Sequence, residues 1–354
     1  MTNSSVTGGT TASTATIRCG VIGVGRMGRH HARICTQVEG ADLIGVVDAS
    51  EARRNDMVEQ YGCGGFATVD ALIAAGVDAC VIATPTVTHR AVVEQLLRAG
   101  VHCLVEKPLA PDEVEAAAMA DAAARCSAVL QVGHVVRFDP VMVAIRDIPA
   151  LTPRFVEIDR VSPMTFRSVD VGVVLDMMIH DLDLLIMLMG SEPEEIHANA
   201  VSVLGDAEDV CNARLVFPAG KDGIRCTANV TASRLALKTE RKIRIISEDT
   251  YVSADFGERR GTVVRKAVNA EQLADIRARF KGGEDLSSLN YLELVKVDAL
   301  EVGKGEPLKL QLESFLTSIR TGGKPFVDAQ AGFAAVRTAQ RIVECARRAG
   351  ARMV

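Results

Sequence analysis

The sequence lacks any long hydrophobic run. Its most apolar stretch, residues 171–189, is interrupted by three aspartates and a histidine, and a membrane-spanning helix needs about 20 apolar residues. The first 16 residues are rich in Ser, Thr and Gly, and they lack the charged start and apolar centre of a signal peptide. We therefore interpret residues 1–16 as a disordered leader and expect a cytoplasmic protein without a membrane partner.

A concentration of positive charge is also missing. The chain of 354 residues has 40 Lys and Arg against 45 Asp and Glu, a net charge of −5, and the two signs are interleaved. This pattern indicates a solvated surface and argues against nucleic acid as a partner.

The nine cysteines are odd in number and show no zinc-ligand spacing. We interpret them as small core residues in a reducing compartment and predict no metal site.

A glycine motif provides the strongest positive signal. An apolar run at residues 17–22 leads into Gly-Val-Gly-Arg-Met-Gly at 23–28, and a second apolar run at 43–47 ends in Asp48. Strand, glycine turn, helix, strand and acid in this order are typical of a dinucleotide-binding βαβ unit. The motif therefore predicts a nicotinamide dinucleotide as cofactor.

Each glycine has a separate task. Gly23 allows the tight turn, Gly25 lets the pyrophosphate approach the backbone, and Gly28 lets the helix pack against the strand. The first amides of the helix, including those of Arg26 and Met27, then face the phosphates.

The acid at the end of the second strand bears on the choice of cofactor. Asp48 can accept hydrogen bonds from the ribose hydroxyls and would repel a 2′-phosphate. This favours NAD, and NADP is the less favoured alternative because Arg53 and Arg54 lie nearby.

Alternating helices and buried strands continue to about residue 150, which predicts an α/β fold whose N-terminal Rossmann domain, residues 17–150, has a doubly wound parallel sheet. Beyond it, long strands joined by short turns predict an α+β domain, residues 151–328, with an antiparallel or mixed sheet. Residues 329–354 are interpreted as a C-terminal helix that could pack back on the Rossmann domain. The expected strands are 79–83, 101–105, 128–132, 154–161, 195–203, 209–217, 224–232, 242–246 and 262–268; the expected helices are 29–38, 51–61, 69–75, 87–99, 111–125, 171–189 and 308–320, with 271–286 ambiguous between helix and loop.

Ligands bind parallel sheets at the carboxyl ends of the strands, and three polar segments follow expected strands there. Glu106, Lys107 and Pro108 follow residues 101–105; the Lys–Pro bond could be cis, and the alternative for Lys107 is an ordinary solvated side chain. The other two segments contain Thr84 with His89, and Arg137, for which a contact to the cofactor and a surface ion pair remain equal alternatives.

Helix 171–189 carries a second candidate site. Asp176, His180 and Asp183 are spaced by four and three residues, which places them on one helical face. Flanking carboxylates can orient an imidazole, and a histidine pKa of about 6.5 suits proton transfer. The alternatives are a satisfied core histidine and a metal site, the latter disfavoured because no other His or Cys cluster completes it.

These motifs together resemble the Gfo/Idh/MocA family of NAD(P)-dependent oxidoreductases. The resemblance implies a Rossmann domain followed by an open, mostly antiparallel sheet, through which a homodimer or homotetramer would form. It also implies that the protein oxidises or reduces a hydroxyl-bearing carbon of a sugar or cyclitol. Lys107, Asp176 and His180 match the catalytic residues of the family.

Three segments, 133–140, 174–183 and 241–255, most resemble the UDP-N-acetylglucosamine 3-dehydrogenases of this family, although Asp139 stands where that group more often has Asn. The resemblance implies a nucleotide-sugar substrate and oxidation of the C3 hydroxyl of UDP-N-acetylglucosamine to the 3-keto sugar. The alternatives are a dehydrogenase of a free cyclitol or hexose, such as myo-inositol, and a non-catalytic NAD(P)-binding regulator. Cations available in the second domain for a substrate diphosphate are Arg160, Arg167, Arg234 and Lys238.

Overall fold

The computed structural model describes residues 15–165, 171–204, 207–220, 222–287 and 289–350. The predicted leader falls almost entirely outside this range, and so does Arg167. The chain divides into two compact units: the first ends at His134 and resumes over Leu308–Phe333, and the second comprises Val135–Pro307 and the chain from Ala334 onward. Residues 135–150, expected in the Rossmann domain, thus belong to the second unit.

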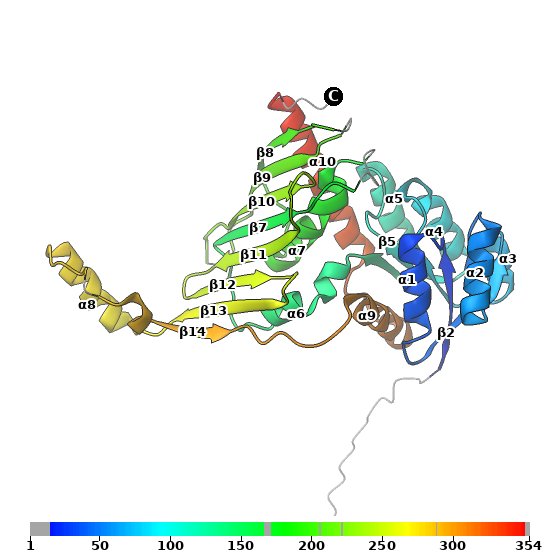
Figure 1. The fold of residues 1–354 in the computed structure, drawn as a ribbon, viewed down its shortest axis with the longest axis horizontal. Helices are drawn as coiled ribbons and strands as arrows, with labels where there is room; N and C mark the ends of the chain where they lie inside the picture. The colour runs from blue at the N-terminus through cyan, green and yellow to red at the C-terminus, as the bar shows by residue number, and fades with distance from the viewer. Residues whose placement is uncertain (1–14, 166–170, 205–206, 221, 288, 351–354) are drawn as a thin grey trace, which may run out of the picture. The chain divides into compact units, whose positions relative to one another are not determined.

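The first unit is a Rossmann domain. Among its described residues, six strands form a parallel sheet in the order β3-β2-β1-β4-β5-β6, as in dinucleotide-binding folds. The strands are β1 Ile17–Ile22, β2 Ala41–Val47, β3 Gly64–Phe66, β4 Ala79–Ile82, β5 His102–Glu106 and β6 Leu130–Gly133, and the helical segments are α1 Arg26–Cys35, α2 Glu51–Tyr61, α3 Val69–Ala74, η1 Thr86–Thr88, α4 His89–Arg98, α5 Glu113–Ala124 and α9 Pro307–Thr321 (Figure 1).

The start of α5 differs from the prediction. Helix 111–125 was expected to open on Pro111, but the side chain of Asp112 accepts the Glu115 N–H at 2.8 Å and caps a helix that begins at Glu113. Proline therefore precedes the cap, because Asp112 supplies the oxygen that the first helical amides require.

The helix that returns to the Rossmann sheet is α9. It buries Leu308, Leu312 and Phe315, and the buried Gln131 of β6 donates to its Gln311 carbonyl at 3.1 Å. Helix α10, Ala329–Arg348, begins in the first unit, but beyond Ala334 its apolar residues enter the core of the second unit. The return to the Rossmann domain considered for residues 329–354 is thus limited to the beginning of α10, up to Phe333, and most of the contact is made by α9.

The second unit contains a mostly antiparallel sheet. Eight strands of its described part run in the order β14-β13-β12-β11-β7-β10-β9-β8, and only β7 and β10 pair in parallel. The strands are β7 Phe155–Val161, β8 Glu195–Val201, β9 Val210–Val216, β10 Thr227–Ser233, β11 Glu240–Ile246, β12 Thr250–Asp255, β13 Arg260–Lys266 and β14 Val295–Ala299, and the helical segments besides α10 are η2 Val135–Phe138, α6 Pro140–Arg146, η3 Val174–Met178, α7 Ile179–Met189, α8 Ala270–Lys281 and η4 Tyr291–Glu293.

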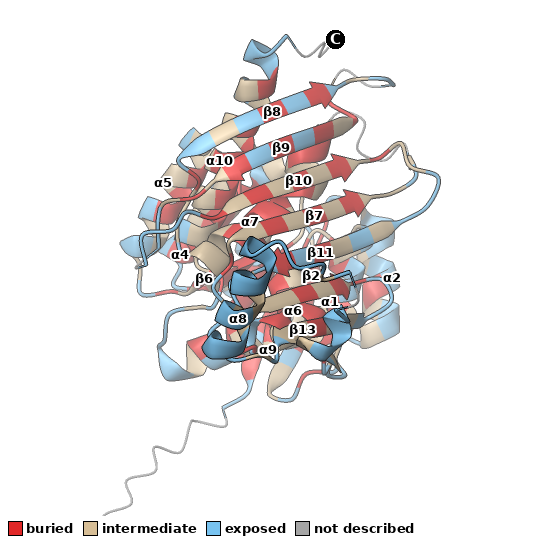
Figure 2. Ribbon diagram, turned by 90° about the vertical axis from the view of Figure 1, so that its left-hand side faces the viewer, coloured by how far each residue is buried: buried red, intermediate tan, exposed pale blue. Residues whose placement is uncertain are grey.

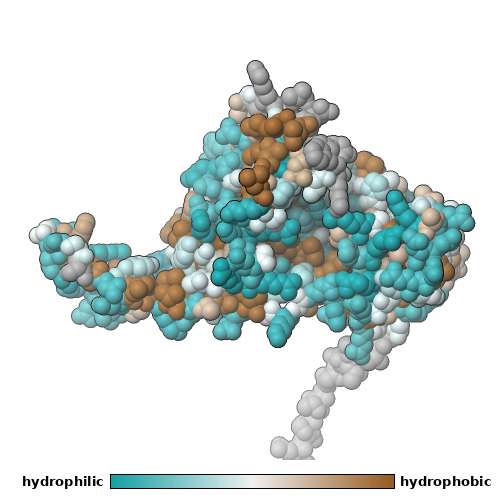
Figure 3. All heavy atoms as spheres, in the orientation of Figure 1, coloured by the Kyte–Doolittle hydropathy of each residue, from teal (hydrophilic) through white to brown (hydrophobic). Residues whose placement is uncertain are grey.

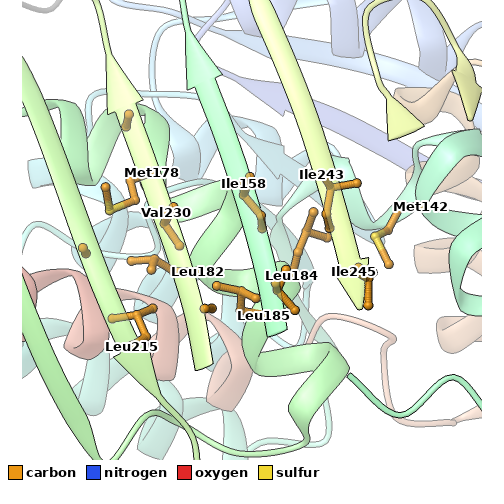
Figure 4. Packing of buried hydrophobic residues seen from close by; sticks show 14 of the residues in the cluster. Met142, Ile158, Met178, Leu182, Leu184, Leu185, Leu215, Val230, Ile243 and Ile245 are labelled. Atoms are coloured by element: carbon orange, nitrogen blue, oxygen red, sulfur yellow. The ribbon is translucent and has the colours of Figure 1, made fainter. Parts of the chain in front are cut away.

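One face of this sheet packs against helices. Side chains from α6 and α7, such as Met142, Leu182 and Leu185, meet inward-pointing residues of the strands, such as Ile158 and Ile243 (Figure 4). The alternation of buried and accessible residues along β7 and β10 follows from the period of two in a strand.

The other face of the sheet is open. Figure 2 looks onto it, with α7 and α10 behind the strands. Helix α8 has no buried residue among those described, and it lies beyond the β13–β14 edge in Figure 1. Of the two alternatives for residues 271–286, helix and loop, the structure has a helix over Ala270–Lys281.

The helices of the described residues include no candidate for a membrane span. No helix in that part of the chain combines the length and apolar character needed to cross a membrane. On the face drawn in Figure 3, hydrophobic residues form separate patches among hydrophilic ones.

Candidate functional site

The glycine turn between β1 and α1 has the backbone geometry that the sequence predicts. Gly23 has φ +83°, and a Cβ there would lie 2.8 Å from the Ala83 carbonyl oxygen. A Cβ on Gly28 would lie 1.8 Å from the Gly23 carbonyl oxygen, so the turn and helix close tightly only with glycine. A Cβ on Gly25 would meet no atom within 4 Å, which leaves open space at the helix start.

The Asp48 carboxylate is fixed at the end of β2. Its oxygens accept the N–H groups of Val24 at 2.9 Å and Ser50 at 2.8 Å. Arg53 approaches the same carboxylate at 3.8 Å, whereas Arg54 donates to the Asp48 carbonyl at 2.7 Å. Of the two arginines considered for a 2′-phosphate, only Arg53 lies at the carboxylate.

A pocket of about 610 Å³ opens over this end of the sheet. Gly23, Gly25, Asp48, Arg53 and Thr84 are among the residues that line it. The volume is in the range of small-molecule and cofactor sites. The open space at Gly25, the helix start and the fixed carboxylate fit a dinucleotide with its pyrophosphate at the turn and its ribose at Asp48.

Lys107 follows β5 directly and is half-buried, and the Lys107–Pro108 bond is cis, one of the two expected forms. The preceding Glu106 contacts His31 of α1, with 2.6 Å between Oε1 and Nε2. Burial alone would raise the pKa of Glu106, but the hydrogen bond and charge of His31, together with Lys107, bring this pKa below its ordinary value. Glu106 thus links the end of β5, which Lys107 follows, to the helix of the glycine turn.

His89 connects two loops at the same edge. Its Nε2 lies 3.1 Å from the Thr84 carbonyl oxygen, and its Nδ1 lies 3.1 Å from that of Pro108 and 3.3 Å from that of Leu109. Burial lowers the pKa of His89, while these carbonyls act in the opposite direction. His89 therefore positions the loops that carry Thr84 and Lys107.

The helix of the second candidate site begins with a π-helical turn, η3, rather than as the regular α-helix that was expected. Asp176 lies in this turn and His180 in the first turn of α7, and both are partly accessible. Single π-helical turns are frequent at functional sites.

The other acids of this helix are buried in ion pairs. Asp183 binds the guanidinium of Arg137 at 2.7 and 2.6 Å, and Asp181 binds that of Arg160 at 2.8 and 2.7 Å. Both partners of each pair are at most 6% exposed. Arg137 therefore forms a buried ion pair, not the surface pair considered from the sequence. Because both oxygens of Asp183 bind Arg137, this carboxylate differs from the expectation that it orients the imidazole of His180.

Sequence reasoning missed two of these residues. His31 lies three positions after Gly28 on the first helix, and this spacing is its only signal. Arg160 was considered only as a ligand of a substrate diphosphate, and its ion pair with Asp181 was not predicted. Among the described residues, no group of three His, Cys, Asp or Glu side chains could hold a metal ion.

Comparisons with known proteins agree with this architecture. Residues 17–134 match the model of an oxidoreductase family with an NAD-binding Rossmann fold, and residues 155–253 match the model of the GFO/IDH/MocA C-terminal domain. The UDP-N-acetylglucosamine 3-dehydrogenase of Acidithiobacillus ferrooxidans is 35% identical over 316 residues, which are 89% of this chain and 93% of that protein. A solved structure of that enzyme superposes with a TM-score of 0.82 at 33% identity, covering 94% of this chain and 98% of the other.

Inositol dehydrogenases are also similar. The myo-inositol 2-dehydrogenase of Thermotoga maritima is 28% identical over 89% of this chain and 92% of its own length. The inositol 2-dehydrogenase of Rhizobium meliloti is 34% identical over 59% of this chain and 68% of its own. With both domains matched in order, the chain belongs to the GFO/IDH/MocA family and is an NAD-binding oxidoreductase that acts on a CH–OH group.

Proposed function

We propose that this protein oxidises the C3 hydroxyl of UDP-N-acetylglucosamine to the 3-keto sugar with NAD. The similarity to the Acidithiobacillus ferrooxidans enzyme supports this substrate, because it extends over nearly all of both chains at 35% identity. The inositol dehydrogenases match at lower identity or over a shorter part of the chain.

The accessibility of Asp176 and His180 carries the proposal. Their helix has four ionisable residues in the segment 176–183, and two of these, Asp181 and Asp183, are neutralised by arginines in the interior. Asp176 and His180 keep partly accessible surface. A carboxylate and an imidazole about one turn apart form a suitable pair for proton transfer to or from a substrate.

We assign three roles to side chains. His180 accepts the proton of the sugar hydroxyl, and Lys107 donates a hydrogen bond to the same oxygen and stabilises its developing negative charge. Asp176 orients the sugar or the imidazole. When bound, NAD supplies the hydride acceptor.

The experiment replaces each proposed catalytic side chain separately. Lys107→Ala and His180→Ala should each lower kcat by about 100-fold or more, the scale of acid–base assistance, while NAD affinity, measured by fluorescence titration, stays close to that of the wild type. Lys296→Ala and His197→Ala, at exposed positions of β14 and β8, serve as matched controls. Near-normal kcat in both test variants would contradict the assignment.

A substrate panel separates the alternatives. Wild-type protein is mixed with NAD and either UDP-N-acetylglucosamine or myo-inositol, and reduced nicotinamide is followed by absorbance. Turnover of the nucleotide sugar alone supports the proposal, and turnover of myo-inositol alone supports a cyclitol dehydrogenase. NAD binding without turnover of any sugar or cyclitol in a wider panel would support the non-catalytic regulator.

A further inference from the structure

Two arginines stand side by side at one end of the second sheet. Arg160 of β7 and Arg241 of β11 are direct partners in the antiparallel pairing of these strands, so their side chains share a face. It is the helix-covered face, because Ile158 and Ile243, two residues away on each strand, lie in the core.

The first of these arginines is already neutralised. The Arg160 guanidinium holds both oxygens of Asp181, the residue after His180, and both side chains are buried. This pair anchors the beginning of α7, and with it His180, against the end of β7. Arg160 has therefore little charge to offer a ligand.

Arg241 differs in both respects. It is exposed to solvent, and it has no ion pair among the described residues. Partial desolvation, and then the charge of Arg160, lower the pKa of its guanidinium, with Asp181 and Asp139 acting in the opposite direction. An arginine stays charged in proteins. Arg241 therefore keeps a positive charge that no ion pair among the described residues neutralises, and it lies two residues along β11 from the core residue Ile243.

A third arginine lies near this end of the sheet. The Phe256 N–H donates to the Arg241 carbonyl at 2.9 Å, which fastens the chain after β12 to the start of β11. Arg259 follows in that turn, and its charge, like those of Arg241 and Arg160, acts on Asp139. The charges of all three arginines act on Asp139, and Arg160 alone pairs with Asp181, so these two carboxylates do not balance the three guanidinium groups.

We propose that Arg241 is a specificity-determining residue that binds the diphosphate of a nucleotide-sugar substrate, with Arg259 as the second cation. This inference rests on the proposed function and deepens it. A guanidinium binds phosphate oxygens through two parallel hydrogen bonds, and a neutral cyclitol would give Arg241 nothing to bind. Among the cations considered from the sequence, Arg234 is unsuitable because it is buried against Asp209 at 2.7 Å.

The test replaces Arg241→Gln and uses Arg244→Gln as the matched control. Arg244 lies on the same strand, points to the open face and pairs with Glu157 at 3.2 Å. Arg241→Gln should raise KM for UDP-N-acetylglucosamine by about 10- to 100-fold, the scale of a lost charge-assisted hydrogen bond, with kcat and the KM for NAD little changed. Arg241→Lys keeps the positive charge but not the two parallel N–H donors of the guanidinium, so its KM for UDP-N-acetylglucosamine should lie between those of the wild type and Arg241→Gln.

Binding of UDP, measured by calorimetry, gives a second readout that needs no turnover. UDP should bind the wild type and Arg244→Gln alike and bind Arg241→Gln at least about 10-fold more weakly. An active wild type with unchanged KM and unchanged UDP affinity in Arg241→Gln would overturn the role of Arg241 and leave the proposed function standing. A wild type that oxidises myo-inositol but neither oxidises UDP-N-acetylglucosamine nor binds UDP would overturn both.

Discussion

The cofactor preference of this protein depends on the carboxylate of Asp48. Two backbone amides hold its oxygens, so the negative charge stays at the end of β2. A 2′-phosphate on the adenosine ribose would meet this charge, whereas ribose hydroxyls can donate to it. Arg53, 3.8 Å from the carboxylate, is the residue able to favour a phosphate once the charge is removed.

Asp48→Asn should therefore shift the preference toward NADP. We expect the ratio of kcat/KM for NADP to kcat/KM for NAD to rise about 10-fold, equivalent to about 1.4 kcal/mol of repulsion relieved. Asparagine keeps an oxygen that can accept the Val24 or Ser50 amide. Asp42→Asn, at an exposed position near the start of the same strand, is the control, and an unchanged ratio would contradict the role of Asp48.

At the scale of single residues, the glycine motif could be read from the sequence, because a tight turn imposes a local requirement on Gly23 and Gly28. Long-range pairs could not be read in this way. Arg137 and Asp183 are 46 positions apart, and Arg160 and Asp181 are 21 apart. Spacing along the chain holds no information on such pairs, since they form only when separate elements pack.

At the scale of elements, the contact of His31 with Glu106 links α1 to β5. The pKa of Glu106 is below its ordinary value of 4.5, so the folded state binds this proton less readily than the unfolded state. The stabilising contribution is fully present above about pH 4.5 and is lost as the pH falls through the folded-state pKa.

Glu106→Gln should consequently flatten the acid limb of the stability curve. The free energy of unfolding, measured by urea denaturation between pH 3 and 7, should fall less steeply below about pH 4.5 in the variant than in the wild type. Glu113→Gln, in the first turn of α5, is the comparison variant. An acid limb with the same slope in Glu106→Gln and the wild type would exclude this contribution.

Most strands and helices were predicted to within a few residues, because buried strands are continuous apolar runs and helices show clear periodicity. Helix α6 was missed although Asp139 and Pro140 are clear start signals, because it is only seven residues long. The strands that were missed had weak patterns. Strand β3 has three residues, two of them glycine, and β12 and β14 contain polar residues at accessible positions. The π-helical turn before α7 was also missed, since an apolar sequence of this kind fits either helix type.

At the scale of the whole molecule, the open face of the second sheet suggests an assembly. We propose that copies of this chain associate through this face as a homodimer or homotetramer. Strand β10 carries small, uncharged side chains at accessible positions of this face, Asn229 and Thr231, and next to it Arg244 of β11 pairs with Glu157 of β7. A second copy could cover them without burying unpaired charge.

Light scattering coupled to size-exclusion chromatography should then give a mass of two or four times 37.7 kDa. Thr231→Arg should lower this mass, because it places an unpaired cation in the interface. Glu59→Arg, on the exposed side of α2, should not lower it. A monomeric wild type would rule out the assembly.

The Rossmann sheet is completed by chain that is synthesised late. The Val132 N–H donates to the Val327 carbonyl at 2.9 Å, and α9 buries its apolar face in the same unit. During synthesis on the ribosome, almost 200 further residues must therefore follow β6 before Val327 can cover the edge of this strand. A fragment ending at His134 would expose this edge and the surface under α9, so a self-sufficient cofactor-binding fragment has to be built by joining 15–134 to 308–333.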